Sequence, residues 1–171
     1  MLTKAKIYYQ QDQLNNKDMP EYFDISFIAE KSDSLKSEME FCLNKVGLSE
    51  GENKTKLLCG RQIICTIIDD DVADFEELSI GLAEQIFHKE TIEKEVDEIT
   101  DFVNHCFECI PNLKYALCSY ELNGYLLGGI KELKDLNNTD LLKRFPLVYE
   151  RKESGEPPLL QINTNAQNIF A

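Results

Sequence analysis

The stretch 92–110, IEKEVDEITDFVNHCFECI, carries the most regular apolar pattern of the chain. Its apolar residues are spaced by 4, 3, 4, 3 and 4 positions: Ile92, Val96, Ile99, Val103, Cys106 and Ile110. Since an α-helix turns once in about 3.6 residues, all six lie on one face, which predicts an amphipathic helix. Thr91 can serve as its N-cap, and Pro111 cannot continue it. A helix with one apolar face must bury that face against another layer of structure, so we expect it to pack on a sheet.

Other segments predict that sheet. Residues 22–29, YFDISFIA, alternate apolar and polar side chains and predict a strand, and the apolar run 57–68 predicts a buried, central strand bent at Gly60. Asn123-Gly124 predicts a hairpin between strands 115–122 and 125–130. Two further strands are predicted at residues 4–9 and 147–152.

Three further helices are predicted. The first spans residues 35–46, and a short one lies near residues 139–145. The third spans residues 75–86, where Phe75, Leu78, Leu82 and Ile86 recur at helical spacing, with Asp74 as N-cap and Glu77 at the third position. Together the elements predict one α+β domain over residues 1–155, with a mostly antiparallel sheet and helices packed on one face. Residues 156–171 are expected to form a tail that packs on the surface or is partly mobile.

Composition limits the class of protein. The 171 residues are 43% apolar and 29% charged, with a net charge of −13, which predicts a globular chain. The start, MLTKAKIYYQ, lacks the pattern of a secretory signal, and no apolar run reaches the length of a membrane span. We therefore expect a cytoplasmic protein whose six cysteines are reduced and mostly core residues.

The charge is concentrated in one part of the chain. Residues 69–101 contain 13 acidic and two basic residues, so they carry 11 of the 13 net negative charges. Such a patch is either a solvated face that keeps the protein soluble or a surface that attracts a basic partner, and it argues against nucleic acid as a ligand. The residues predicted to contact a partner are Asp69, Asp70, Asp71, Glu76, Glu90, Glu93, Glu95, Asp97, Glu98 and Asp101, with Tyr120 and Tyr125 on the predicted hairpin as aromatic anchors.

The acidic stretch 68–77, IDDDVADFEE, also resembles two known sites in part. As an EF-hand loop it fails, because Ala73 replaces a calcium ligand and Asp74 replaces the glycine of the sharp turn. Asp69 and Asp71 after an apolar strand resemble the D-x-D motif of haloacid-dehalogenase-type phosphotransferases, over about ten residues. That resemblance implies magnesium-dependent phosphoryl chemistry, although this chain has Ala73 where the family has Thr or Val.

The cysteines and histidines do not form a recognised site. Cys106 and Cys109 have the C-x-x-C spacing, but a structural zinc site needs four ligands, and only His88, His105 and Cys118 are nearby in sequence. A thioredoxin-like role is not favoured, because such pairs begin a helix and these end one. We expect Cys106 to be a core residue, and we expect no metal and no cofactor.

No catalytic motif is present, so a binding protein is the favoured class. In size, acidity and lack of such motifs the chain resembles bacterial immunity proteins, which neutralise a cognate toxin by binding it. The sequence therefore predicts a small acidic protein that binds a basic protein, such as a nuclease toxin. Two alternatives remain open: a metal-dependent phosphotransferase or hydrolase that uses Asp69 and Asp71, and an adaptor or regulatory subunit whose 92–110 stripe pairs with another helix.

Overall fold

The computed structural model describes residues 22–51, 56–68, 72–83, 92–120, 127, 129–153 and 156–163. In chain order they form β1 (Tyr22–Glu30), α1 (Leu35–Lys45), β2 (Ser49–Glu50), β3 (Lys56–Leu58), β4 (Arg61–Ile68), β5 (Phe75–Ala83), α2 (Ile92–Cys109), β6 (Leu113–Tyr120), η2 (Leu133–Asn137), α4 (Thr139–Leu142), β7 (Leu147–Glu150) and β8 (Leu159–Ile162). Within these residues the strands form one eight-stranded antiparallel sheet in the order β2-β3-β4-β5-β1-β6-β7-β8. The predicted α+β fold is confirmed.

The sheet has two chemically different faces, as β1 at its centre shows. Phe23, Ile25 and Phe27 point to one face, which we call the inner face. Ser26 and Ile28 point to the other, the outer face, since side chains alternate along a strand. The neighbouring strands keep this division, because Ser26 lies opposite Ser79 of β5 and Leu117 of β6.

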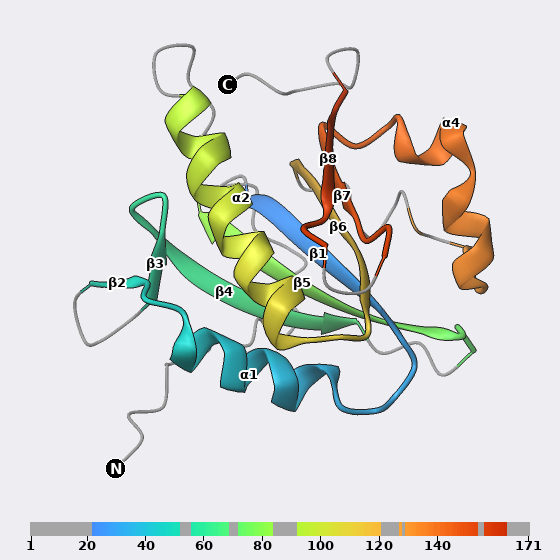
Figure 1. The fold of residues 1–171 in the computed structure, drawn as a ribbon, viewed down its shortest axis with the longest axis horizontal. Coiled ribbons are helices and arrows are strands. Elements are labelled where there is room, and N and C mark those ends of the chain that lie inside the picture. The colour runs from blue at the N-terminus through green and yellow to red at the C-terminus, as the bar shows by residue number, and fades with distance from the viewer. Residues whose placement is uncertain are drawn as a thin grey trace, which may run out of the picture.

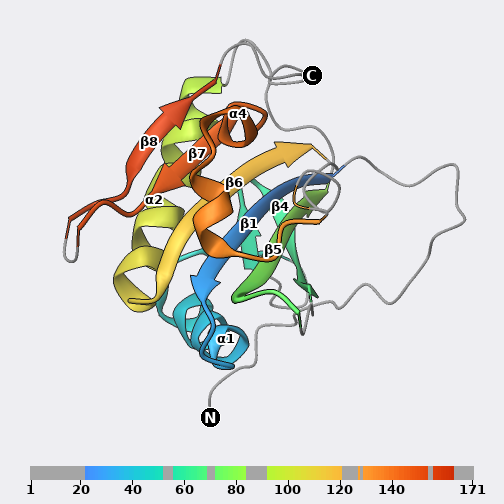
Figure 2. The same cartoon turned by 90° about the vertical axis from the view of Figure 1, so that its right-hand side faces the viewer.

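Helices α1 and α2 cover the inner face, with α1 running across the lower end of α2 in the view of Figure 1 (Figures 1 and 2). Their apolar faces and the inner face form the larger of two core clusters, in which the rings of Phe27 and Phe102 meet edge to face with centroids 6.1 Å apart. Each such fully buried side chain contributes about 1.5–3 kcal/mol. Ile99, Val103 and Cys106 are fully buried here, so the predicted helix is confirmed and its stripe is core.

The C-terminal end of α2 is fixed by Arg151, just after β7. The Arg151 guanidinium donates to the carbonyl oxygens of Phe107 (2.6 Å), Ile110 (3.3 Å) and Leu113 (2.8 Å). Its Cζ also lies 4.9 Å from the centroid of the Phe107 ring. A positive charge at this end complements the helix dipole and satisfies carbonyls that have no partner within the helix.

The two short helices η2 and α4 lie on the outer face (Figure 2). Leu136, Leu141 and Phe145 pack there against Ile28 of β1 and Leu117 of β6 in the second core cluster. Two contacts tie this segment to the β4–β5 connection: the Leu133 amide donates to Asp74 Oδ1 (2.6 Å), and the Asp74 amide donates to the Lys131 carbonyl (2.8 Å). The two long helices therefore share one face, and the short predicted helix packs on the other.

The predicted helix 75–86 is wrong, because residues 75–83 form strand β5. Leu78 and Leu82 fit both periods, and Ile80 between them completes an alternating row on the inner face. Pairing with β1 on one side and β4 on the other outweighs the helical pattern. Asp74 is accordingly no helix N-cap, and Glu77 is a buried residue in the middle of the sheet.

Other boundaries differ from the prediction in smaller ways. The run 57–68 is split by a two-residue turn into β3 and β4, with Cys59 at φ 52° and Gly60 at φ 69°. The predicted strand at 4–9 and the turn at Asn123-Gly124 lie outside the described residues. The strand 125–130 is wrong at Leu127, Gly129 and Ile130, which belong to no strand, while β6 pairs with β1 and β7.

Residues 159–162 of the predicted tail form β8, which pairs with β7. Leu160 packs on the inner-face core, whereas Leu159 and Ile162 are 55% and 53% exposed. In the part of the chain that the structure describes, no helix is long and apolar enough to cross a membrane.

Candidate functional site

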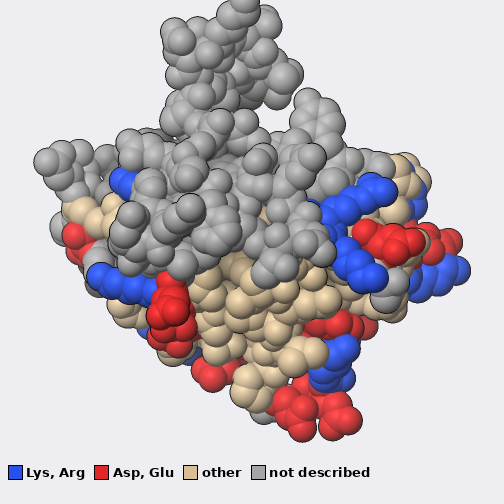
Figure 3. All heavy atoms as spheres, turned by 90° about the horizontal axis from the view of Figure 1, so that it is seen from above, with Lys and Arg blue, Asp and Glu red and all other residues tan. Residues whose placement is uncertain are grey.

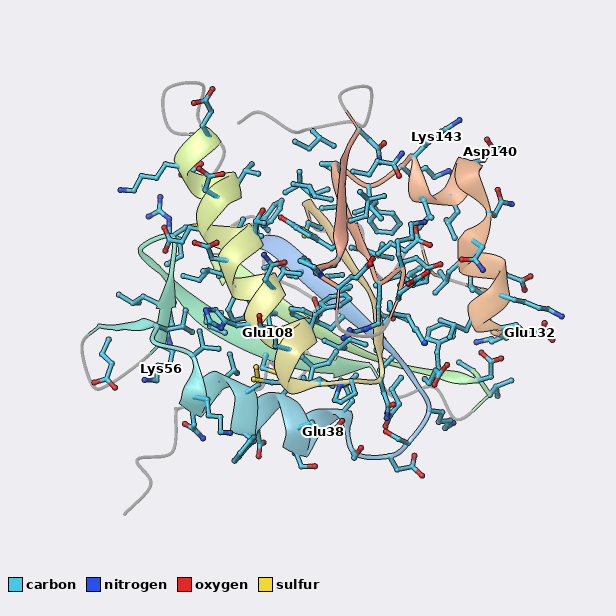
Figure 4. All side chains as sticks on the ribbon, viewed as in Figure 1. Glu38, Lys56, Glu108, Glu132, Asp140 and Lys143 are labelled. Atoms are coloured by element: carbon cyan, nitrogen blue, oxygen red, sulfur yellow. The ribbon has the colours of Figure 1, made fainter. Side chains whose placement is uncertain are left out.

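Helix α2 presents a row of acidic side chains on the side turned away from the sheet. Glu93, Asp97 and Asp101 are all exposed, and their spacing of four places them on one line, which we call the acidic ridge. His105 and Glu108 continue this line toward the end of the helix that Figure 4 marks with Glu108. None of the three ridge carboxylates has an ion-pair partner among the described residues.

The acidic ridge does not stabilise the helix that carries it. Glu93 in the first turn is favoured by the positive end of the helix dipole, but Asp97 and Asp101 lie beyond that turn. Like charges four residues apart on a helix destabilise it by about 0.2–0.5 kcal/mol per pair. The ridge therefore costs the fold a little free energy.

Glu95 and Glu98 of the same helix turn toward the protein instead. The Cys59 amide, in the turn between β3 and β4, donates to Glu98 Oε1 at 2.7 Å. The Cys59 thiol lies 3.7 Å from the Glu95 carbonyl oxygen, and Glu95 Oε2 is buried with no hydrogen-bond partner among the described residues. The Glu98 carboxylate therefore holds the turn in which Cys59 and Gly60 have positive φ, and the Glu95 and Glu98 side chains are partly buried rather than fully exposed.

The other predicted contact residues are divided between structural roles and the undescribed part of the chain. Glu76 Oε2 accepts from the amide (3.2 Å) and the hydroxyl (3.3 Å) of Ser32, before α1. Tyr120 is the last residue of β6. Outside the described residues lie Asp69, Asp70, Asp71, Glu90 and Tyr125.

A second candidate site is a row of polar side chains buried on the outer face, on β1, β5 and β6. Ser26, Ser79 and Ser119 are 0%, 7% and 3% exposed, and Glu77 is 7% exposed. Ser26 Oγ donates to Glu77 Oε1 at 3.0 Å. Asp24 lies on the same face, opposite Ser119 in the register. We call these five residues the outer polar row.

Glu77 is the titratable centre of the outer polar row. Burial, reinforced by the negative charge of Asp24, raises the pKa of its carboxyl from the usual 4.5 to about 7, although the Ser26 hydrogen bond acts in the opposite direction. A carboxyl that titrates near neutral pH is suited to proton transfer or to a pH-dependent contact.

Comparisons with protein-family models, curated proteins and solved structures found no match for this chain.

The outer polar row could be predicted from the sequence only in part. Asp24 and Ser26 were recognisable as the polar half of an alternating strand, which predicts exposure to solvent. Nothing in the local pattern indicated that Ser26 is fully buried, because its partner Glu77 is 51 residues away in sequence. The incorrect helix over residues 75–86 also placed Glu77 at a helix end.

A shallow groove of about 820 Å³ runs along η2 and α4. Its lining carries both signs of charge, with Lys134 and Arg144 beside Asp135 and Asp140. Seen from above, basic and acidic side chains stand together at this end of the molecule (Figure 3). The mixture favours no single class of ligand. Among the described residues, no group of three or more His, Cys, Asp or Glu is placed to hold a metal ion.

Proposed function

We propose that this chain is a binding protein that docks a basic protein partner on the acidic ridge of α2. The observation that carries the proposal is the geometry of Glu93, Asp97 and Asp101, three exposed carboxylates on one line of a well-anchored helix. Among the described residues they form no ion pair, and their position on one line of the helix supports a role in binding a basic surface.

The physical role of such a ridge is to steer and orient the encounter. Charges of one sign on a rigid element raise the association rate with an oppositely charged surface, and salt screens that effect with a Debye length of about 10 Å at 0.1 M. The burial of the opposite side of α2 in the core keeps the ridge in place. Binding would then need little rearrangement of the chain.

In its narrower form the partner is a toxin with a cationic active site, and this chain is its immunity protein. This narrower form is supported only by the opposite charges of the acidic ridge and of a cationic active site. The partner's cationic cleft would lie over the ridge and be blocked by it.

The phosphotransferase alternative draws on one structural observation. Strand β4 ends at Ile68, directly before Asp69, as a D-x-D motif at the end of a strand requires. Metal-dependent phosphatase activity that disappears in Asp69→Asn would favour this alternative over the binding protein.

The experiment is affinity capture from the native host with two charge variants of equal net charge. The ridge variant carries Glu93→Lys, Asp97→Lys and Asp101→Lys. Its matched control carries Lys at three exposed acids elsewhere: Asp140, Glu153 and Glu156. Circular dichroism and urea unfolding first establish that both variants are folded.

The expected result is a basic protein captured by the wild type and by the control, and lost with the ridge variant. Capture of the same protein equally by both variants would contradict the proposal, because position on α2 would then not matter. An acidic or uncharged captured protein would contradict it as well.

A further inference from the structure

Strand β8 is the last strand of the sheet, and beyond it no further strand pairs among the described residues (Figure 2). Its antiparallel register with β7 places Ile162 opposite Leu147. One position further, the Asn163 amide donates to the Pro146 carbonyl at 2.9 Å. Since alternate residues of an antiparallel strand bond to the same neighbour, Leu160 and Ile162 direct their N–H and C=O groups to the open edge.

The open edge of β8 lacks the charges that usually keep sheet edges from pairing. The strand has the sequence LLQI, with no charged residue, and it follows Pro157 and Pro158. Ile162 is 53% exposed. At the opposite edge of the sheet, β2 has only two residues, and Glu50 there forms an ion pair with Lys56 at 3.0 Å. Of the two edges, β8 is therefore the one suited to accept another strand.

The side chain of Asn163 holds β8 in position. Its Nδ2 donates to the carbonyl oxygens of Leu142 (3.1 Å) and Phe145 (2.8 Å), at and just after the end of α4. Leu160 packs on the inner-face core. The edge is therefore fixed before a partner binds, and the addition of a strand costs little ordering of β8.

Ile162 points to the inner face, the face that α2 covers. Leu160 packs on the core of this face, and Ile162 follows it by two positions, so both side chains point the same way. Leu147, opposite Ile162, is also an inner-face core residue. A strand added beside β8 would place every second side chain on the face where α2 lies.

Two contacts show how β7 and β8 lie along α2. Arg151 donates to the Phe107 carbonyl at 2.6 Å, near the end of the helix, and the Tyr149 hydroxyl lies 2.9 Å from the Thr100 hydroxyl, near its middle. Two residues further back along β7 is the position opposite Ile162. Ile162 therefore lies level with the first half of α2.

The ridge residues in this half of α2 lie on the side nearest β8. Asp97 and Glu93 precede Thr100 by three and seven positions, so they share the side of the helix on which Thr100 contacts β7. Both acids are exposed. Negative charge therefore borders the open edge of β8 on the inner face.

We propose that the basic partner adds a strand to β8, antiparallel to it, with Lys or Arg side chains on the inner face beside Glu93 and Asp97. Main-chain hydrogen bonds to Leu160 and Ile162 give the strand its affinity, and the acids select a basic residue at every second position. This mode of binding rests on the proposed function, because the acidic ridge supplies the charge that selects the strand.

The charge also decides against a second copy of the chain as the occupant. A second copy would bring another net charge of −13 and another acidic ridge to the same edge, so like charges would oppose the pairing. A basic strand meets opposite charge instead.

The test is an NMR titration of the isotope-labelled full chain with a short synthetic peptide in which Lys and Val alternate. In the proposed arrangement the Lys side chains lie on the inner face, so the Lys amides point to β8 and the Val amides point away. The Leu160 and Ile162 amides should shift and exchange more slowly with solvent. N-methylation of the Lys amides should weaken binding about tenfold, whereas N-methylation of the Val amides should leave it unchanged.

Two pairs of substitutions separate the edge from the charge. Ile162→Pro removes an amide that faces the open edge and spares the β7 bonds of Gln161 and Asn163, whereas Ile162→Thr keeps the amide; only the proline variant should lose about tenfold in affinity. Asp97→Lys should weaken binding about fivefold, whereas Asp140→Lys in α4, on the outer face, should not. Urea unfolding first establishes that each variant is folded, and the methylated peptides need no variant.

Equal affinity of the two methylated peptides would overturn strand addition, and so would a peptide that does not bind. If the peptide still bound equally in both methylated forms but more weakly to Asp97→Lys, the ridge would bind basic ligands without β8, and the proposed function would stand. Loss of binding on methylation of Val instead of Lys would place the Lys side chains on the outer face and overturn the proposal. A dimer that Ile162→Pro dissociates in size-exclusion chromatography would overturn it too, because a second copy would then occupy the edge.

Discussion

Substitution of the buried carboxylate Glu77 by glutamine should remove a pH-dependent loss of stability. Burial raises the pKa of Glu77 in the folded chain from 4.5 to about 7. Below pH 4.5 the folded and unfolded chains are both protonated at this site, so no free energy is lost. Between pH 4.5 and 7 the unfolded chain gives up the proton while the folded chain keeps it, and stability falls by about 1.36 kcal/mol per pH unit. Above pH 7 the loss is complete.

The magnitude follows from that rise in pKa. The full loss is about 3 kcal/mol, of which about 2.5 kcal/mol falls between pH 5 and pH 8. Glutamine is neutral throughout and can still accept the Ser26 hydrogen bond at 3.0 Å. The free energy of unfolding of Glu77→Gln minus that of the wild type should therefore be about 2.5 kcal/mol larger at pH 8 than at pH 5.

The assay is urea unfolding of both chains at the two pH values. Groups other than Glu77 titrate in both chains, so their contribution drops out of the difference in free energy of unfolding. The control is Glu153→Gln, at an exposed position, and its difference from the wild type should stay constant. Ser26→Ala should enlarge the wild-type loss, because the Ser26 hydrogen bond favours the charged carboxylate. An unchanged difference between Glu77→Gln and the wild type at pH 5 and pH 8 would refute the reasoning.

Three further substitutions test the fold around the sites, each by urea unfolding. Arg151→Lys should lose about 1–2 kcal/mol, because one ammonium group cannot serve the carbonyls of Phe107, Ile110 and Leu113 together, and a neutral result would deny Arg151 its capping role. Cys59→Asn should gain about 0.5–1 kcal/mol, since Asn tolerates the φ of 52° in this two-residue turn better than Cys; a loss would show that the Cys59 thiol matters more than the backbone. Tyr149→Phe should lose about 1 kcal/mol, because it removes the 2.9 Å hydrogen bond to Thr100, and no loss would mean that water replaces that bond.

The sequence predicted those elements whose period is unambiguous. The 4-3-4-3-4 stripe of α2 admits only a helix, and the alternation in 22–29 admits only a strand, so both are confirmed. Strand β5 was missed because Leu78 and Leu82 fit either period, and only pairing with β1 and β4 decides between them. A local sequence pattern does not show which strands, distant in sequence, pair with one another.

In the candidate sites, too, a local pattern predicts some features, and others depend on contacts between distant parts of the chain. The exposure of Glu93, Asp97 and Asp101 follows from their position opposite the apolar stripe, and it was predictable. The hydrogen bond of Glu98 depends on a turn 39 residues away in sequence, and that of Glu77 depends on Ser26, 51 residues away. Such contacts are set by the tertiary fold, so the sequence alone did not indicate them.

The salt dependence of the affinity tests most directly whether the acidic ridge binds a basic partner. The measurement is the dissociation constant of the captured protein at low and high salt, for the wild type and for the variant reversed at Glu93, Asp97 and Asp101. We predict that salt weakens the wild type by about tenfold, equivalent to about 1.4 kcal/mol, and that the ridge variant binds weakly at both salt concentrations. Equal affinity of the two chains, unchanged by salt, would contradict the claim.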